Sequence, residues 1–222
     1  MTHRVLLLVF PEFQLLDATG PADVFAAVDE HLPAMARPAY QLQAISLDGG
    51  MVASSSGLAL ATQPLPEPQE VAGSTLLIAG GHGVQRALQQ GHVAAWLGQA
   101  GPLAARCASV CTGAFLLAQT GLMSGRKVVT HWRYAELLQR LHPSVEVLHD
   151  SLFVRDGGFY SSAGVTAGMD LCLSLVEEDH GREVSLQVAK GLVMYLRRPG
   201  GQRQFSTELL AQQAPADGLM QR

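Results

Sequence analysis

The amino-acid sequence predicts an α/β fold in which a mainly parallel sheet lies between helices on both of its faces. Short apolar runs of strand length alternate along the chain with segments of helical periodicity. The first run is continuously apolar, which is typical of a strand buried on both faces of a parallel sheet. The 222 residues are 48% hydrophobic, enough to bury one sizeable core. We therefore expect one domain followed by a tail.

The expected strands are short runs that are either wholly apolar or alternate in polarity. Asp48-Gly49-Gly50 and Asp156-Gly157-Gly158 are expected to be turns. The expected strand ranges are Arg4–Phe10, Tyr40–Leu47, a strand pair within Met51–Ala61, Thr75–Ala79, Ala108–Val110, Val128–Val129, Val145–Leu148, Leu152–Val154 and Phe159–Ser162.

The expected helices are bounded by proline at their starts and glycine at their ends. Pro21 is expected to open the first helix, and Gly121 to end the helix after the strand Ala108–Val110. The helical ranges are Ala22–Val28, segments within Val84–Gly101, Thr112–Thr120, Tyr134–Leu141, Met169–Glu178 and Glu183–Leu196. We expect the domain to span residues 1–196 and residues 197–222 to form a linker.

Cys111 lies at the predicted strand-to-helix turn, with Ser109 and Gly113 two residues to either side. Small neighbours allow a sharp turn to project one side chain over the sheet edge, as in a nucleophile elbow. The N-terminus of the following helix would stabilise a thiolate. We therefore expect a reactive thiol, with a small buried core residue as the alternative, since most free cysteines are of that kind.

Two further turns are expected at the same edge of the sheet. Asp17 is expected in a loop between the first strand and the first helix, where open α/β sheets form their sites. A loop or capping carboxylate is its alternative. Gly80, Gly81 and His82 follow the strand at 75–79. The glycines would let N–H groups point at a bound atom, as in an oxyanion hole, although many such turns carry glycine for packing alone.

His131 follows the expected strand Val128–Val129, and it is expected near the thiol, with a packed or capping histidine as the equal alternative. Cys107, Cys111 and Cys172 make an odd number of cysteines, which fits a reducing cytoplasm without a disulfide framework. Cys107 and Cys111 lack the paired spacing of a zinc site, so neither a metal nor a cofactor is expected.

Charge and hydropathy argue against several classes of protein. The balance of 15 basic and 19 acidic residues gives a net charge of −4, which argues against a general nucleic-acid surface. Val5–Phe10 is short and is interrupted by Pro11, unlike a signal peptide. No apolar run is long enough to span a bilayer. We therefore expect a cytoplasmic protein with no membrane partner.

Five short motifs, in this order, point to one family. They are Asp17 before the first helix, Gly80-Gly81, Ser109-Val-Cys-Thr-Gly113, Val129-Thr-His-Trp132 and Ser162-Ala-Gly-Val-Thr-Ala-Gly-Met169. Over roughly the first nine-tenths of the chain, this set resembles the DJ-1/PfpI superfamily. The resemblance implies a class I glutamine-amidotransferase-like, flavodoxin-like fold. Cys-Thr-Gly and Thr-His-Trp resemble two branches: isonitrile hydratases, and the sensor domains of GlxA-like, AraC-type transcription regulators.

The protease-like members of the superfamily place a histidine after the cysteine, where this chain has Thr112. DJ-1 itself has a glutamate near the thiol, and Asp17 occupies the matching place here, as in the hydratases. Peptidase and glutamine amidotransferase activities are therefore poorly supported by the resemblance.

Residues 193–206 are similar to the segment that joins the sensor domain of the regulators to their helix-turn-helix domain. The resemblance then implies that DNA is contacted only through a C-terminal domain that this chain lacks. The basic residues of this segment, Arg197, Arg198 and Arg203, have a simpler interpretation as a solvated helix end that complements the helix dipole.

Three hypotheses of function follow, and residues 197–206 favour the first. In the first, a dimerising sensor domain binds a small molecule or registers an oxidant in its Cys111 pocket. In the second, an isonitrile hydratase-like enzyme uses Cys111 as nucleophile and Asp17 as general acid/base. The N–H groups of Gly81 and Thr112 would then stabilise the developing anion. The third is a dimerisation module with an inactive pocket.

Overall fold

The computed structural model of the chain describes residues 2–194 and 198–204. An eight-stranded sheet has the order β3-β4-β2-β1-β5-β6-β10-β9, and β7 and β8 form a separate two-stranded sheet. The strands are β1 (His3–Leu8), β2 (Tyr40–Ser46), β3 (Asp48–Ala53), β4 (Ala59–Pro64), β5 (Thr75–Ile78), β6 (Arg106–Val110), β7 (Lys127–Val128), β8 (Glu146–Val147), β9 (Phe153–Asp156) and β10 (Phe159–Ser162).

The helices follow most strands of the parallel part. They are α1 (Leu15–Ala26), α2 (Val84–Gln90), α3 (His92–Ala100), α4 (Gly113–Gln119), α5 (Ala135–Leu141) and α6 (Thr166–Gly191). Short 3-10 turns connect them: η1 (Ala27–His31), η2 (Ala34–Ala36), η3 (Pro68–Val71), η4 (Gly101–Leu103) and η5 (Trp132–Tyr134). None of the helices within the described residues is both long and apolar enough to cross a bilayer.

The centre of the sheet is parallel, as predicted. Strands β2, β1, β5, β6 and β10 pair in parallel in that spatial order. Counted along the chain, this is the order 2-1-3-4-5 of flavodoxin-like sheets, in which the strand order reverses between β1 and β5. Strands β3 and β9 pair antiparallel at the two edges. The predicted fold class is therefore confirmed, and a ligand site is expected at the carboxyl ends of β1 and β5.

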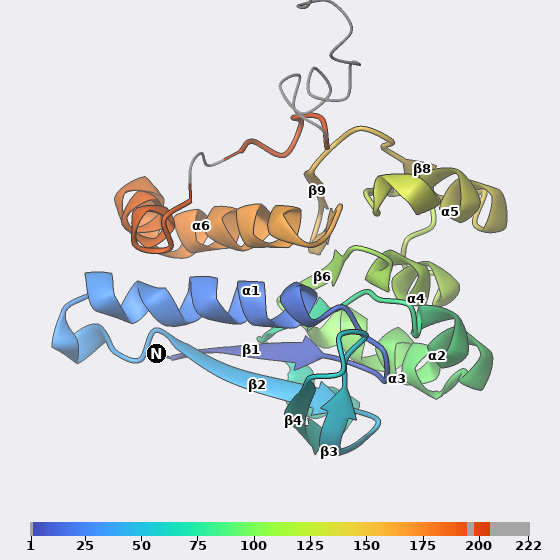
Figure 1. The fold of residues 1–222 in the computed structure, drawn as a ribbon, viewed down its shortest axis with the longest axis horizontal. Coiled ribbons are helices and arrows are strands. Elements are labelled where there is room, and N and C mark those ends of the chain that lie inside the picture. Colours follow the sequence, from blue (N-terminus) through green and yellow to red (C-terminus); the bar gives the residue numbers. More distant parts are fainter. Residues whose placement is uncertain (1, 195–197, 205–222) are drawn as a thin grey trace, which may run out of the picture.

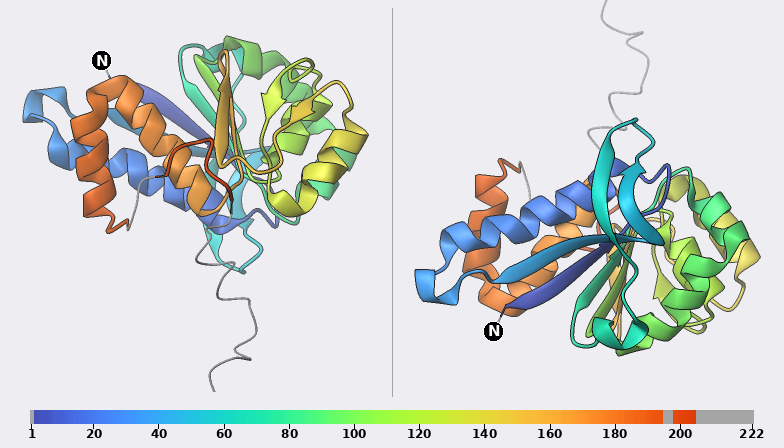
Figure 2. Two further views of the ribbon diagram at one scale, coloured as in Figure 1. Left: turned by 90° about the horizontal axis from the view of Figure 1, so that it is seen from above. Right: turned by 90° about the horizontal axis from the view of Figure 1, so that it is seen from below.

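Helices cover both faces of this sheet (Figure 1). In the views from above and below, α1 and α6 lie on one side and α2 to α5 on the other (Figure 2). Alternate residues of β1 enter the two cores: Val5 and Leu7 pack with the α1 and α6 side chains, and Leu6 and Leu8 with the opposite layer. This alternation explains why the strand is apolar at every position from Val5 to Leu8.

Two local predictions are wrong. Helix α1 begins at Leu15, so Asp17 lies in its first turn instead of a loop, and Pro21 lies inside the helix. Packing overrides the proline signal, because Asp17, Ala18 and Gly20 of α1, which precede Pro21, are buried. The second error is at residues 48–50, which belong to β3 and pair with β4 instead of forming a turn.

The structure agrees with the prediction of two helices at the end of the domain. They are joined within the element α6 and meet at Gly181, where the backbone is not helical (φ 85°, ψ 167°). Arg197 and most of the predicted linker lie outside the described residues. Arg198–Gln204 are described, and this segment lies against the domain beside β9 (Figure 1).

Candidate functional site

Cys111 occupies the sharp turn between β6 and α4, as predicted. Its φ of 56° is in the left-handed region that side chains other than glycine seldom adopt. The turn is fixed from both sides: Cys111 N–H donates to Ser162 O (3.0 Å), and Thr130 Oγ1 donates to Cys111 O (2.8 Å). Gly164 lies against it, because a Cβ on Gly164 would be 2.9 Å from Cys111 Sγ. Such backbone strain is characteristic of a nucleophile elbow.

Asp17 lies beneath the thiol and is 1% exposed. Its Oδ2 accepts the Gly80 N–H (3.0 Å) and its Oδ1 accepts the Val165 N–H (2.8 Å). Both oxygens are therefore held by backbone donors from the turn after β5 and the start of α6. Burial raises the pKa of Asp17 to about 6, against the opposing effect of these donors and of the Cys111 side chain.

The surroundings of Cys111 oppose the thiolate that the N-terminus of the following helix would stabilise. Burial raises the pKa of the Cys111 thiol, and the negative charge of Asp17 raises it further, whereas the Thr112 N–H and hydroxyl lower it. Only 8% of Cys111 is exposed, so desolvation outweighs the stabilisation of a thiolate by one turn of helix. At neutral pH the pair therefore rests as a protonated thiol above a carboxylate.

The predicted oxyanion donors are partly occupied. Thr112 Oγ1 accepts the Gly81 N–H (2.8 Å) and donates to Gly81 O (3.2 Å). The Gly80 N–H is held by Asp17. Of the two expected donors, the Thr112 N–H faces the sulfur, and the Gly81 N–H is already satisfied within the protein. A substrate oxyanion would first have to displace the Thr112 hydroxyl.

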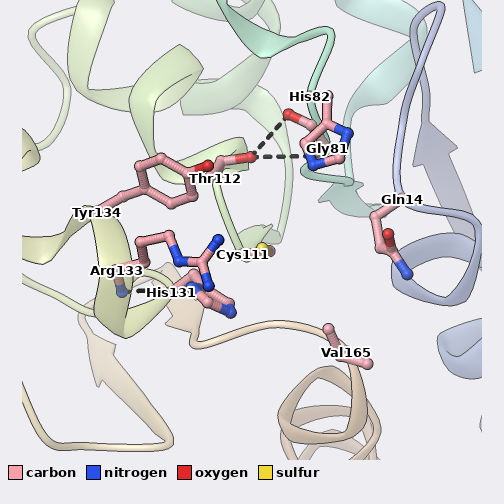
Figure 3. A pocket seen from close by; sticks show the side chains of 9 residues that line it. All are labelled: Gln14, Gly81, His82, Cys111, Thr112, His131, Arg133, Tyr134 and Val165. Atoms are coloured by element: carbon pink, nitrogen blue, oxygen red, sulfur yellow. Dashed lines mark hydrogen bonds between the residues drawn. The ribbon is translucent and has the colours of Figure 1, made fainter. Parts of the chain in front are cut away.

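The thiol opens into a pocket of about 190 Å³ above the sheet edge (Figure 3). The structure brings His82 and His131 into this pocket with Cys111 and Thr112, whereas Asp17 lies behind the thiol. A second, more apolar cavity of about 230 Å³ adjoins it on the side of α2 and α5 and shares His82 and Thr112. The first pocket is lined by Gln14, Gly81, His82, Cys111, Thr112, His131, Arg133, Tyr134 and Val165. Within the described residues, no group of His, Cys, Asp or Glu side chains could hold a metal ion.

Sequence reasoning missed Arg133, Tyr134, Gln14 and Val165, which also line the pocket. Arg133 directly follows the Thr-His-Trp motif, so its position next to His131 was the available signal. The His131 Nδ1 accepts the Arg133 N–H (3.3 Å), and burial, with the Arg133 charge, lowers the pKa of His131. His131 is therefore neutral at neutral pH. Arg133 makes the wall of the pocket cationic, because no carboxylate is among the described residues that line it.

This cationic wall predicts that Cys111 reacts preferentially with anions. In Arg133→Gln, the ratio of the alkylation rate with iodoacetate to that with iodoacetamide is expected to fall about threefold, because a full positive charge on the pocket wall is lost. The ratio, measured by mass spectrometry at pH 8, cancels any change in the thiolate fraction. Arg140→Gln, an exposed cation on α5 outside the pocket, is the control. Equal ratios in the wild type and in Arg133→Gln would contradict the assignment.

The fold and the site together define a flavodoxin-like α/β protein with a cysteine elbow at the sheet edge where the strand order reverses. The chain belongs to the DJ-1/PfpI family, whose family model matches residues 3–178.

Both predicted branches of the family are among its relatives. The chain is 32% identical over 192 residues to isonitrile hydratase of Pseudomonas putida, a match covering 85% of this chain and 78% of the hydratase. It is 31% identical over 154 residues to the HTH-type transcriptional regulator GlxA of Rhizobium meliloti, covering 69% of this chain. The match spans 47% of that regulator, about half its length.

Among solved structures, an AraC family transcriptional regulator from Pseudomonas putida superposes with a TM-score of 0.75 at 22% identity. The superposition covers 86% of this chain and 99% of that one. At this level of identity, the likeness supports the fold alone.

Proposed function

We propose that the chain is the N-terminal, ligand-sensing domain of an AraC-family transcription regulator, and that Cys111, Thr112, His82, His131 and Arg133 form its ligand pocket. The observation that carries the proposal is the occupied Gly81 N–H: Thr112 closes the position that an oxyanion would need, and leaves a pocket suited to binding. The similarity to GlxA over the same region supports it.

Of the two signals considered, the structure favours a ligand over an oxidant. Oxidation of a cysteine follows its thiolate character and its exposure. Cys111 is buried, and both burial and Asp17 raise its pKa, so it is a slow target for peroxide. A small molecule with a negative charge fits the cationic wall better.

DNA recognition would then belong to a helix-turn-helix domain joined through residues 197–222. We propose that the domain acts in the cytoplasm as a homodimer, because helix-turn-helix regulators bind two half-sites as dimers.

The alternative is an enzyme of the isonitrile hydratase type, favoured by the similarity over 85% of the chain and by the buried acid beneath the thiol. Cys111 would add to the isonitrile carbon, and Asp17, with a pKa of about 6, would exchange the proton as general acid/base. Water would then add to the carbon bound to sulfur and expel the Cys111 thiol, which gives an N-substituted formamide and restores the free cysteine.

One pair of measurements separates the two functions. The purified chain is expected to gain thermal stability with at least one small anionic metabolite in a screen by melting temperature, and to show no Cys111-dependent hydration of an alkyl isonitrile. Cys111→Ala is the control for turnover. Formamide production that disappears in Cys111→Ala would establish the enzyme and overturn the sensor proposal.

A further inference from the structure

Residues 198–204, here called the strap, cross the surface next to the Cys111 site. The two ends of the strap form hydrogen bonds with residues at or next to the groups that hold Asp17 and Cys111 in place. Gly200 O accepts the N–H groups of Leu152 (2.8 Å) and Phe153 (3.2 Å), so the strap pairs with the start of the edge strand β9. The approach is close: a Cβ on Gly200 would lie 2.6 Å from Phe153 O. This segment leads directly to the undescribed C-terminal residues.

The first end of the strap is anchored at the start of α6. Arg198 donates to the Asp170 carboxylate through its side chain (2.9 and 2.6 Å) and its backbone N–H (3.1 Å). It also donates to Thr166 Oγ1 (3.0 Å). Asp170 is fully buried, so this pair is held in a fixed geometry. Thr166 directly follows Val165, whose N–H holds Asp17.

The second end is anchored beside the thiol. Gln204 Nε2 donates to Thr130 O (3.1 Å), and Gln204 Oε1 accepts the Trp132 N–H (2.9 Å). Thr130 is the residue whose hydroxyl holds the carbonyl of Cys111, and the residue between Thr130 and Trp132 is His131, which lines the pocket. The Gln204 side chain is thus hydrogen-bonded to the backbone on both sides of the pocket residue His131.

We propose that the strap is the coupling element of the pocket: its docked state holds Thr130 and Val165 in place, and an occupied or modified pocket releases it. The Arg198 anchor is connected to Asp17 through the neighbouring residues Thr166 and Val165. The Gln204 anchor is connected to Cys111 through Thr130. Coupling between two sites acts equally in both directions. If a change at Cys111 loosens the strap, then loosening the strap must also expose Cys111. The proposal rests on the sensor function and gives it a route to the C-terminal domain.

The test uses two glycine variants of the whole chain. Gly200→Ala places a methyl group against the backbone of Phe153, whereas Gly201→Ala makes the same change where nothing lies within 4 Å. Hydrogen exchange at the Leu152 and Phe153 amides reports docking, and the rate of Cys111 alkylation by iodoacetamide reports the site. Gly200→Ala is expected to speed both at least threefold, and Gly201→Ala neither. Alkylating Cys111 in the wild type is expected to speed exchange at the same two amides.

Faster exchange in Gly200→Ala with an unchanged alkylation rate would overturn the proposal, as would alkylation without any change in exchange. If Gly200→Ala leaves exchange unchanged, the exchange rate and the alkylation rate are measured in Gln204→Glu instead, and the same outcomes support or overturn the proposal. This variant loses an anchor of the strap because a carboxylate cannot donate to Thr130 O. Gln202→Glu is its matched control. The sensor function is tested separately, because the coupling is measured here without a ligand. The sensor function would be contradicted if no ligand stabilised the chain in the melting-temperature screen.

Discussion

Replacing Asp17 with asparagine is expected to remove a pH dependence of stability worth about 1.4 kcal/mol between pH 5 and pH 7.5. Burial raises the pKa of Asp17 in the folded protein to about 6, above the ordinary aspartate value of 3.8. The folded state therefore binds more protons than the unfolded state in this window. The stability contributed by the protonated carboxyl is fully present below about pH 4 and is lost as the pH rises through 6.

Urea unfolding at the two pH values, for the wild type and Asp17→Asn, measures this difference. Asparagine also disturbs the bonds to the Gly80 and Val165 N–H groups, but that cost is the same at both pH values and cancels. Asp23→Asn, the same change at an exposed position of α1, is the control and is expected to behave like the wild type. An equal pH dependence in Asp17→Asn and the wild type would show that Asp17 does not titrate in this range.

The same variant is expected to make Cys111 more reactive. The negative charge of Asp17 raises the pKa of the thiol, so its removal lowers that pKa and increases the thiolate fraction at pH 8. Each pKa unit is worth tenfold in thiolate below the pKa, so alkylation is expected to be on the order of tenfold faster. Cys111→Ala identifies the labelled site, because Cys107 and Cys172 are also free but fully buried. Slower alkylation in Asp17→Asn would instead indicate that the carboxylate activates the thiol as a base.

Gly164→Ala is expected to destabilise the protein by roughly 4 kcal/mol and to close the site. The φ of Gly164 is 92°, and an added Cβ would lie 2.7 Å from Cys111 Cα and 2.9 Å from Cys111 Sγ. A side chain there has both an unfavourable backbone conformation and a collision with the elbow, and the elbow cannot move away because Ser162 and Thr130 hold it.

Gly121→Ala separates these two contributions. Gly121 has a similar φ of 80°, and nothing lies within 4 Å of a Cβ there. It is expected to cost about 1–2 kcal/mol, the conformational part alone. Thermal unfolding of both variants gives the comparison. Equal destabilisation would mean that the contact between Gly164 and the elbow has no energetic weight.

Much of the site was predictable because its residues follow strands. Asp17, Gly80, Gly81 and Cys111 come after β1, β5 and β6, which are adjacent in the sheet. The carboxyl ends of parallel neighbours share one edge, so residues far apart in sequence meet there. His131 follows β7, which belongs to the separate two-stranded sheet, so its place in the pocket does not follow from that shared edge.

Other features depended on contacts that local signals do not encode. The start of α1 was misjudged because the Pro21 signal is local, whereas the packing that extends the helix upstream is tertiary. The pocket cation Arg133 lies on a short 3-10 turn whose direction no periodicity reveals. The composition of the strap is polar and glycine-rich, which is typical of a linker, and only its contacts with Asp170 and Thr130 show where it docks.

The sequence by itself determined the parallel α/β sheet, the sharp turn at Cys111 and the family, because hydrophobic periodicity and small residues at fixed spacing are local properties of the chain. The tertiary structure decided the charge state of the Asp17–Cys111 pair and the occupation of the Gly81 N–H. The helix N-terminus visible in the sequence argued for a thiolate, but the pKa depends on how completely the fold removes water from the pair. Desolvation is a property of the folded surroundings, and it opposes the thiolate that the helix N-terminus favours.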